Sequence, residues 1–129
     1  MPRNAKPSAV PASLQPCPRA QNCVSSQATR TSQRIDPFPC VGTCEETLAR
    51  LRSLIELTAG ANIVTSTSDY LRAEYRSTFL RFVDDLELLV DSNSSVIQVR
   101  SASRVGSWDL GANRRRVEDL RRRFARLQQ

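Results

Sequence analysis

Apolar residues recur at helical spacing in the stretch that follows Thr43. Thr43 and Glu46 form the Thr-x-x-Glu pattern of a capping box, in which each side chain satisfies a backbone N–H group at the start of a helix. The helix is predicted to run to about Thr58, because Gly60 is a natural left-handed stop. Its predicted inner face consists of Leu48, Leu51, Leu54, Ile55 and Thr58.

After Gly60 the apolar positions alternate with polar ones, which is typical of β-strands with one buried face. In the second of these strands, for example, Leu71, Ala73 and Tyr75 fall on one face. The strands follow one another closely, so we expect them to form a four-stranded antiparallel meander. Their predicted bounds are Ala61–Ser66, Asp69–Arg76, Leu80–Val90 and Ser95–Arg104.

The polar residues Asp91–Ser94 between the last two strands suit a four-residue hairpin loop. Such a loop pairs Val90 with Ser95 and thereby fixes the register of the hairpin. Apolar residues then meet on the inner face, while polar and oppositely charged residues meet on the outer face. The predicted pairs are Leu86 with Val99 and Leu88 with Ile97 inside, and Asp85 with Arg100 and Glu87 with Gln98 outside.

Asp84 breaks this pattern, because the same register places it on the inner face opposite Ser101. A carboxylate that points inward is costly unless it has hydrogen-bond partners. Ser103, Arg114 and the loop 106–113 can supply them. Two interpretations follow: a structural network that holds the last helix on the sheet, or a binding pocket at the strand end. The predicted network or ligand site comprises Asp84, Asp85, Arg100, Ser101, Ser103, Arg104, Asp109, Asn113 and Arg114.

A second amphipathic helix is predicted over Ala112–Leu127, with Asp109 or Asn113 as its N-cap. Its apolar stripe consists of Val117, Leu120, Phe124 and Leu127. The predicted fold is therefore α+β: a helix, the four-stranded antiparallel meander, and a C-terminal helix packed on one sheet face. Residues 40–129 would form this single domain, and residues 1–39, rich in Pro and Ser, an irregular N-terminal arm.

Four cysteines lie in the arm or at its end: Cys17, Cys23, Cys40 and Cys44. Neither pair has the two-residue spacing of a zinc knuckle and the chain has no histidine, so a metal site is disfavoured. The sequence leaves two states of the cysteines open, free thiols and a disulfide. A disulfide would be Cys17–Cys23 or a bridge from the arm to Cys40 or Cys44. If thiols are free, Cys44 is expected to be the most reactive, because it lies in the first turn of a helix.

The net charge of +6 is unevenly distributed along the chain. Residues 1–39 carry +4, residues 40–113 carry −3, and residues 114–129 carry +5. This asymmetry favours an anionic partner, such as an acidic protein surface or lipid head groups, although a solvated helix face gives the same pattern. Nucleic acid is disfavoured because no aromatic residues interleave with the arginines. The predicted interaction surface is Arg115, Arg116, Arg121, Arg122, Arg123 and Arg126.

The residue content also limits the chemistry. Without histidine the commonest general base is missing. Asp84 and Asp85 are adjacent, but neighbours in a strand point to opposite faces, so they cannot act as a facing pair. We therefore predict no catalytic residue, no cofactor and no metal. No run of about 18 apolar residues and no apolar signal-peptide region occurs, so the chain as encoded is expected to be soluble.

Four pieces of the chain, in this order, resemble the domain-of-unknown-function family 1499: CPRAQNCVSSQ, YLRAEYRS, FVDDLEL and VRSASRVGSWDLGANRRRVEDLR. The resemblance extends from about Cys17 to Phe124. It implies that the arm docks on the domain, and it makes a plastid, thylakoid or cyanobacterial setting plausible. It brings no activity with it. Cys40 and Cys44 look like additions to the family pattern.

Three functional hypotheses result. The first is a non-enzymatic accessory or interaction protein whose basic helix meets an acidic partner in a larger, photosynthetic assembly. The second is an anion or small-molecule binding domain with its site in the stretch 100–114, since arginine forks suit phosphate and carboxylate. The third is a thiol redox protein that uses Cys17 and Cys23. The sequence does not indicate an oligomeric state.

Overall fold

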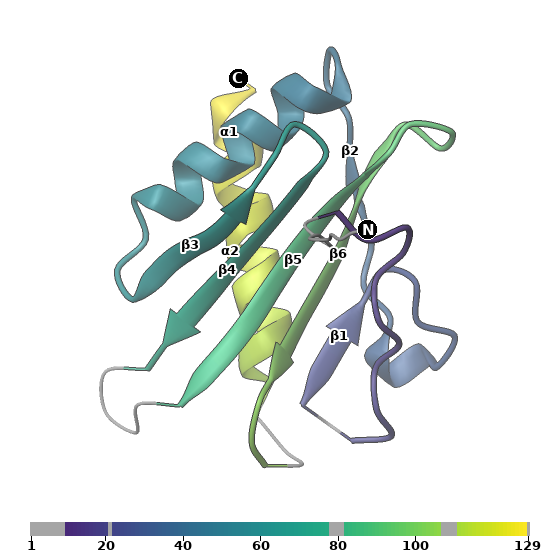
Figure 1. Ribbon diagram of the computed structural model, residues 1–129, viewed down its shortest axis with the longest axis vertical. Helices are drawn as coiled ribbons and strands as arrows, with labels where there is room; N and C mark the ends of the chain where they lie inside the picture. Colours follow the sequence, from purple (N-terminus) through teal and green to yellow (C-terminus); the bar gives the residue numbers. More distant parts are fainter. Residues whose placement is uncertain (1–9, 21, 78–81, 107–110, 129) are drawn as a thin grey trace, which may run out of the picture.

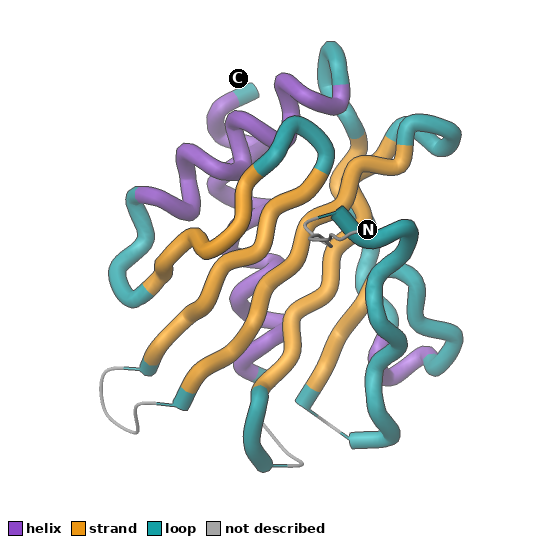
Figure 2. Tube along the Cα trace, in the orientation of Figure 1, coloured by secondary structure: helices purple, strands orange, loops and turns teal. Residues whose placement is uncertain are grey.

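The computed structural model describes residues 10–20, 22–77, 82–106 and 111–128. These residues form a six-stranded sheet of antiparallel strand pairs, with two helices packed on one of its faces (Figure 1). The strand order is β1-β6-β5-β4-β3 (Figure 2). The short strand β2 pairs with the first residues of β6, and β1 pairs with later residues of β6. The strands are β1 (Cys23–Ser25), β2 (Phe38–Pro39), β3 (Ala61–Ser66), β4 (Tyr70–Arg76), β5 (Val83–Asp91) and β6 (Val96–Ser103). The helices are η1 (Thr31–Gln33), α1 (Cys44–Glu56) and α2 (Ala112–Leu127).

The two long helices begin where the sequence predicts. The capping box at α1 is formed: Thr43 Oγ1 accepts from the backbone N–H of Glu46 at 3.0 Å, and Glu46 Oε1 accepts from the N–H of Thr43 at 2.9 Å. The bounds of α2 and β3 coincide with the predicted ones. The prediction for Leu127 is wrong, because this residue was placed in the buried apolar stripe of α2 but is 51% exposed.

The prediction of four strands is wrong, because the N-terminal segment supplies two more. Cys23 pairs with Ala102 and Phe38 pairs with Ile97, so β1 and β2 extend the sheet along the edge of β6. Phe38 is fully buried between sheet and helices. Strands of two or three residues are too short to show a period of two, which is why the sequence pattern missed them.

The predicted register of the β5–β6 hairpin is also wrong, by two residues. Leu86 lies opposite Ser101, not Val99, and Asp84 lies opposite Ser103. The loop is 92–95 instead of 91–94, with Asp91 paired with Val96. Ser95 takes a left-handed φ of 57°, and Asp91 Oδ1 accepts from the N–H of Ser94 at 3.3 Å. A shift of two residues keeps every side chain on its face, so the alternation of apolar residues fits both registers. The corrected pairs are Leu88 with Val99, Val90 with Ile97, Glu87 with Arg100 and Asp85 with Ala102.

The core fills the space between the inner sheet face and the two helices. Its members come from the helices, from β4, β5 and β6, and from the N-terminal segment. The N-terminal segment therefore packs against the same core as the rest of the chain. Among the described residues, no helix has the length and apolar character to span a membrane. Core side chains with no exposed surface include Leu51, Ile55, Leu71, Leu86, Leu88, Ile97, Val99 and Val117.

Candidate functional site

Asp84 and Arg116 form an ion pair on the inner face, between the start of β5 and the second turn of α2. Arg116 Nη2 lies 2.8 Å from Asp84 Oδ2, and the two side chains are only 18% and 13% exposed. The guanidinium group also lies over the ring of Tyr75, 4.6 Å from its centroid. The inward carboxylate that the sequence singled out thus has a charged partner, but this partner is Arg116 and not Arg114.

Asn113 is the centre of a buried polar network beside this pair. Its Oδ1 accepts from Ser101 Oγ at 2.6 Å and from Arg116 Nη1 at 2.8 Å. Its Nδ2 donates to Ser103 Oγ at 2.9 Å and to the carbonyl oxygen of Asn22 at 3.1 Å. Asn113 has no exposed surface. The network therefore connects α2 to β6 and to the residue before β1.

The predicted N-cap of α2 has to be corrected at Asn113. Gly111 precedes the helix, in a left-handed conformation with φ 80°, and as a glycine it has no side chain that could accept a capping hydrogen bond. Asn113 is the second residue of α2 and points into the protein instead. Asp109, the other predicted N-cap and site residue, lies outside the described residues.

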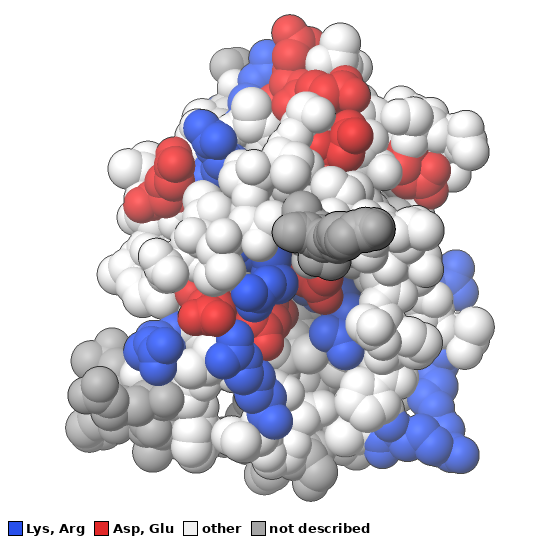
Figure 3. Space-filling model, viewed as in Figure 1, with Lys and Arg blue, Asp and Glu red and all other residues white. Residues whose placement is uncertain are grey.

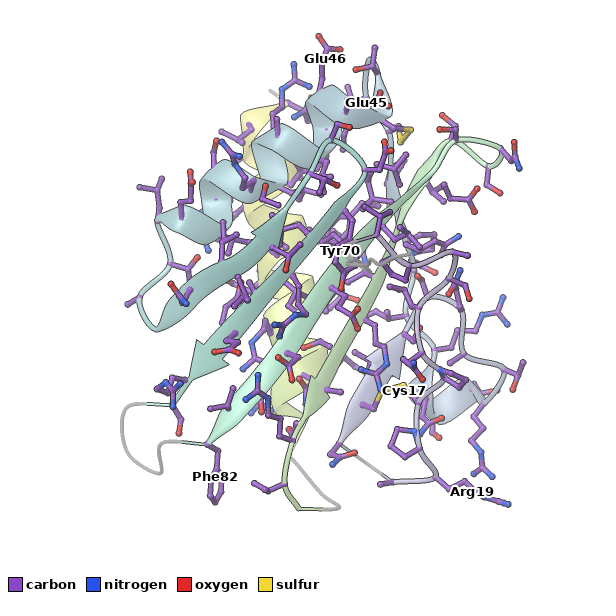
Figure 4. All side chains as sticks on the ribbon, in the orientation of Figure 1. Cys17, Arg19, Glu45, Glu46, Tyr70 and Phe82 are labelled. Atoms are coloured by element: carbon purple, nitrogen blue, oxygen red, sulfur yellow. A yellow bond between two sulfur atoms is a disulfide. The ribbon has the colours of Figure 1, made fainter. Side chains whose placement is uncertain are left out.

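A cavity of about 640 Å³ lies next to the ion pair, at the end of the sheet where β4 stops, β5 starts and β6 stops. Its wall combines aromatic and aliphatic groups with the Asp84–Arg116 pair. Phe82 marks the rim at the lower edge of the sheet (Figure 4) and is 51% exposed. Burial raises the pKa of the Tyr75 phenol in this wall to about 12. The described residues that line the cavity are Ala59, Tyr75, Arg76, Ser77, Phe82, Asp84, Ser103, Val105, Gly106, Ala112 and Arg116.

Arg104 lies on the opposite, outer face of the sheet. Its Nε is 2.8 Å from Asp85 Oδ2, and its Nη2 is 2.6 Å from Glu74 Oε2. The hydrogen bond from Arg104 holds the pKa of Asp85 below its usual range. Burial would raise this pKa, but its effect is smaller. Figure 3 shows these charges of both signs gathered over the middle of the sheet. Arg100 is on this face too, 3.8 Å from Glu87. The predicted site is therefore split: Ser101, Ser103 and Asn113 lie inside, while Asp85, Arg100 and Arg104 lie outside.

Several arginines of α2 hold the N-terminal segment and α1 in place. Arg114 Nη2 donates to the carbonyl oxygens of Ser32 and Arg34 at 3.1 and 3.0 Å. Arg121 donates to backbone carbonyls just before β2, and its guanidinium group lies over the Phe38 ring. Arg123 donates to the carbonyl oxygen of Leu54 and to Thr58 Oγ1 in and after α1. The predicted interaction surface is thus divided, because only Arg115, Arg122 and Arg126 are exposed.

The cysteines form two disulfides, Cys17–Cys23 and Cys40–Cys44. The first closes a loop before β1, and the second joins the residue after β2 to the first residue of α1. No cysteine is free, so Cys44 is not the reactive thiol that its helix position suggested. The Cys40–Cys44 bridge was not among the pairings that the sequence left open. Among the described residues, no three His, Cys, Asp or Glu side chains gather in a way that could hold a metal.

Residues 13–124 match the model of a family described as a protein of unknown function, DUF1499. The chain belongs to this family. The match covers the resemblance expected from the sequence pieces, and it includes β1, the ion pair and most of α2. Comparison with curated proteins and with solved structures finds no match. The comparisons therefore give the DUF1499 chain a family but no activity.

Sequence reasoning missed that Arg116 and Tyr75 belong to the site. Arg116 was assigned to the outward surface because the arginines around it are polar and numerous. It lies three residues after Asn113 and one before Val117, at the border of the apolar stripe. An inward carboxylate on a neighbouring strand, such as Asp84, requires a cation at this border. This charge complementarity between Asp84 and an arginine at the border of the stripe was the signal in the sequence that could have identified Arg116.

Proposed function

We propose that this domain is a non-enzymatic binding domain for a small amphipathic organic molecule. The observation that carries the proposal is the cavity of about 640 Å³, which has a mainly apolar wall and an ion pair at one place in it. Ligand sites typically have volumes of about 300–1,000 Å³ and combine such walls with a few convergent polar groups. This is the small-molecule hypothesis of the sequence analysis, moved to a different set of side chains.

The chemistry of the lining supports an amphipathic ligand. Tyr75, Phe82 and Val105 can contact an apolar body, while Asp84 and Arg116 can bind a polar group. Phe82 and Val105 are 51% and 55% exposed, so a ligand in the cavity would remove apolar surface from water. The described lining residues include no histidine or cysteine, and the one carboxylate among them, Asp84, is already paired with Arg116. Binding is therefore a better fit to these groups than catalysis.

The first test is detection of binding by NMR, with backbone amide signals followed during titration. The probes are 2-naphthol, 1-octanol and octanoate, which differ in shape and charge but fit the volume. At least one probe is expected to shift the amides of Asp84, Ser103 and Arg116. If none of the three probes perturbs these amides at millimolar concentration, the proposal is rejected.

A matched pair of variants locates the binding. Ala112 lines the cavity at the first residue of α2, so Ala112→Phe is expected to fill space that the ligand needs. Ala125 is exposed near the other end of the same helix, so Ala125→Phe is the control. Loss of the shifts in A112F with retention in A125F supports the assignment. Equal binding to both variants contradicts it.

A second proposal concerns the exposed stripe Arg115, Arg122 and Arg126 on α2. These residues are spaced by seven and four positions, so they lie along one line of the helix surface, with Asp119 between them. This stripe supports binding to an acidic protein surface, or peripheral contact with anionic lipid. A partner in a photosynthetic assembly, in plastids or at thylakoids, is the specific form of this proposal that the family resemblance suggested.

The test of the second proposal is co-purification from the native organism at low and high salt. A partner bound through the stripe should be recovered at about 50 mM salt and lost at about 200 mM, because screening weakens exposed charge pairs. Reversal of the three charges to Glu should abolish recovery. Recovery that is insensitive to both salt and charge reversal would argue against the stripe.

A further inference from the structure

The guanidinium group of Arg116 is held in a fixed plane. Asp84 accepts from Nη2, and Asn113 and Ser101 accept from Nη1 at 2.8 and 3.2 Å. Tyr75 covers one face of the plane, with its ring centroid 4.6 Å away. An arginine side chain normally has many rotamers, so fixing it costs conformational entropy. These contacts already fix Arg116, so ligand binding does not have to supply that free energy. Arg116 therefore offers a rigid, flat, positively charged surface.

A further planar group could stack on the face of this guanidinium group opposite Tyr75. The described residues put the Tyr75 ring on one face only, and Arg116 also lines the cavity. Guanidinium groups stack favourably on flat π systems, and this attraction increases where water is excluded. Two further lining groups, the aromatic Phe82 and the aliphatic Val105, can contact a flat partner.

Asp84 adds the requirement that the ligand carries a hydrogen-bond donor. Its Oδ2 accepts from Arg116, whereas no hydrogen bond to its Oδ1 occurs among the described residues. A carboxylate oxygen has two lone pairs and only accepts hydrogen bonds. The group that meets Oδ1 in the cavity therefore has to be a donor, such as a hydroxyl or N–H group.

We infer that the ligand is a planar aromatic or conjugated molecule that stacks on the face of Arg116 opposite Tyr75 and donates a hydrogen bond to Asp84 Oδ1. This inference rests on the proposed binding function and specifies its ligand class. An aliphatic chain would fill the same apolar space but would gain nothing from the flat guanidinium group. Stacking should favour the planar ligand by about 2- to 30-fold in affinity.

The experiment titrates the full, oxidised chain with three probes of nearly equal size, by calorimetry and NMR. The first is 2-naphthol. The second is decahydro-2-naphthol, which has the same carbon skeleton and hydroxyl group but no π face. The third is 2-methoxynaphthalene, which keeps the aromatic ring but has no donor. We expect 2-naphthol to bind tightest, about 2- to 30-fold tighter than the saturated alcohol and about 10-fold tighter than the ether.

Two variants separate the contribution of stacking on Arg116 from that of the hydrogen bond to Asp84. Arg116→Lys keeps the positive charge beside Asp84 but removes the plane, so the preference for 2-naphthol over the saturated alcohol should disappear. Asp84→Asn removes the negative acceptor, so the preference over the ether should decrease. Arg52→Lys, on the exposed side of α1, is the control and should change neither ratio.

The wild-type comparison alone decides the inference, even if a variant fails to fold. Equal affinity for 2-naphthol and its saturated counterpart overturns the inference but leaves the proposed binding function in place. Tighter binding of the ether than of 2-naphthol overturns the donor requirement. If no probe binds, the proposed function fails and the inference fails with it.

Discussion

Phe124 of α2 packs edge-on against Phe38 of β2, with ring centroids 6.4 Å apart and an angle of 82° between the ring planes. Arg121, one turn earlier on α2, lies over the Phe38 ring at 4.6 Å from its centroid. Edge-to-face ring pairs and cation–π contacts are both favourable beyond the area they bury. These contacts connect the last helix to the N-terminal segment, so the two ends of the chain stabilise each other.

The first prediction follows from this packing. Phe124 is 5% exposed, so Phe124→Ala should lower the free energy of unfolding by about 3–5 kcal/mol. Leu127→Ala, one turn later and 51% exposed, should change it by less than about 0.5 kcal/mol. Urea denaturation of the two variants and the wild type measures both effects. Equal stability of the Phe124 and Leu127 variants would show that α2 is not packed as described.

The long elements could be predicted because their signals are local. A capping box, a left-handed glycine and an apolar stripe lie within one helix, so they need no knowledge of the rest of the fold. β1 and β2 could not be predicted, because each has two or three residues and is stabilised by pairing with β6. The β5–β6 register was missed because a shift of two residues leaves the faces of all side chains unchanged.

The candidate site was only half predictable for a related reason. Strand alternation is enough to show that Asp84 points inward, and the structure places its side chain there beside Arg116. Which arginine would meet it depends on how α2 lies on the sheet, and this is a tertiary property. The same applies to Tyr75, which looked like an ordinary inner-face residue of β4 but stacks under Arg116.

The second prediction concerns the ion pair. Arg116→Met leaves the Asp84 carboxylate inside without a cation, and should lower the free energy of unfolding by about 3 kcal/mol. Asp84→Asn should cost less, about 1 kcal/mol, because Arg116 keeps its hydrogen bonds to Asn113 and Ser101. Chemical denaturation at neutral pH measures both values.

The double variant tests whether the two side chains act as a pair. Residues in direct contact are non-additive, so the Asp84→Asn and Arg116→Met double variant should be more stable than the sum of the single effects predicts, by about 1 kcal/mol or more. Asp85→Asn combined with Arg116→Met is the matched control, since Asp85 lies on the other sheet face. Additive effects in the Asp84 cycle would mean that the ion pair is not formed in solution.

The third prediction concerns the two disulfides. Denatured protein kept free of reductant should contain no reactive thiol, and four should appear after full reduction. Replacement of either cystine by two alanines should lower the free energy of unfolding by about 2 kcal/mol, because each closes only a short loop.

The order of reduction should differ between the two bridges. In the first bridge Cys17 is partly exposed but Cys23 is only 3% exposed, whereas Cys40 and Cys44 are both partly exposed, so a reductant reaches the second bridge more easily. Cys44 is also the first residue of α1, where the helix dipole stabilises a departing thiolate. Mild reduction followed by alkylation and mass spectrometry should label Cys40 and Cys44 first. Earlier labelling of Cys17 and Cys23 would instead favour the redox role that the sequence suggested for that pair.

The fourth prediction concerns alkaline pH and Tyr75. Burial raises the pKa of its phenol to about 12, an effect that Arg116 and Arg123 oppose. The pKa of an unfolded tyrosine is about 10, so the fold favours the neutral form. The stabilisation is therefore complete below about pH 10 and is lost as the pH rises from there toward 12.

The ultraviolet absorbance of the phenolate should show that Tyr75 does not titrate near pH 10 in the folded protein. Tyr75→Phe keeps the ring under Arg116 but has no proton to lose, so its free energy of unfolding should decline less over this interval. A decline as steep as that of the wild type would exclude Tyr75 as its source and leave Tyr70, whose pKa is also raised by burial and by Glu87.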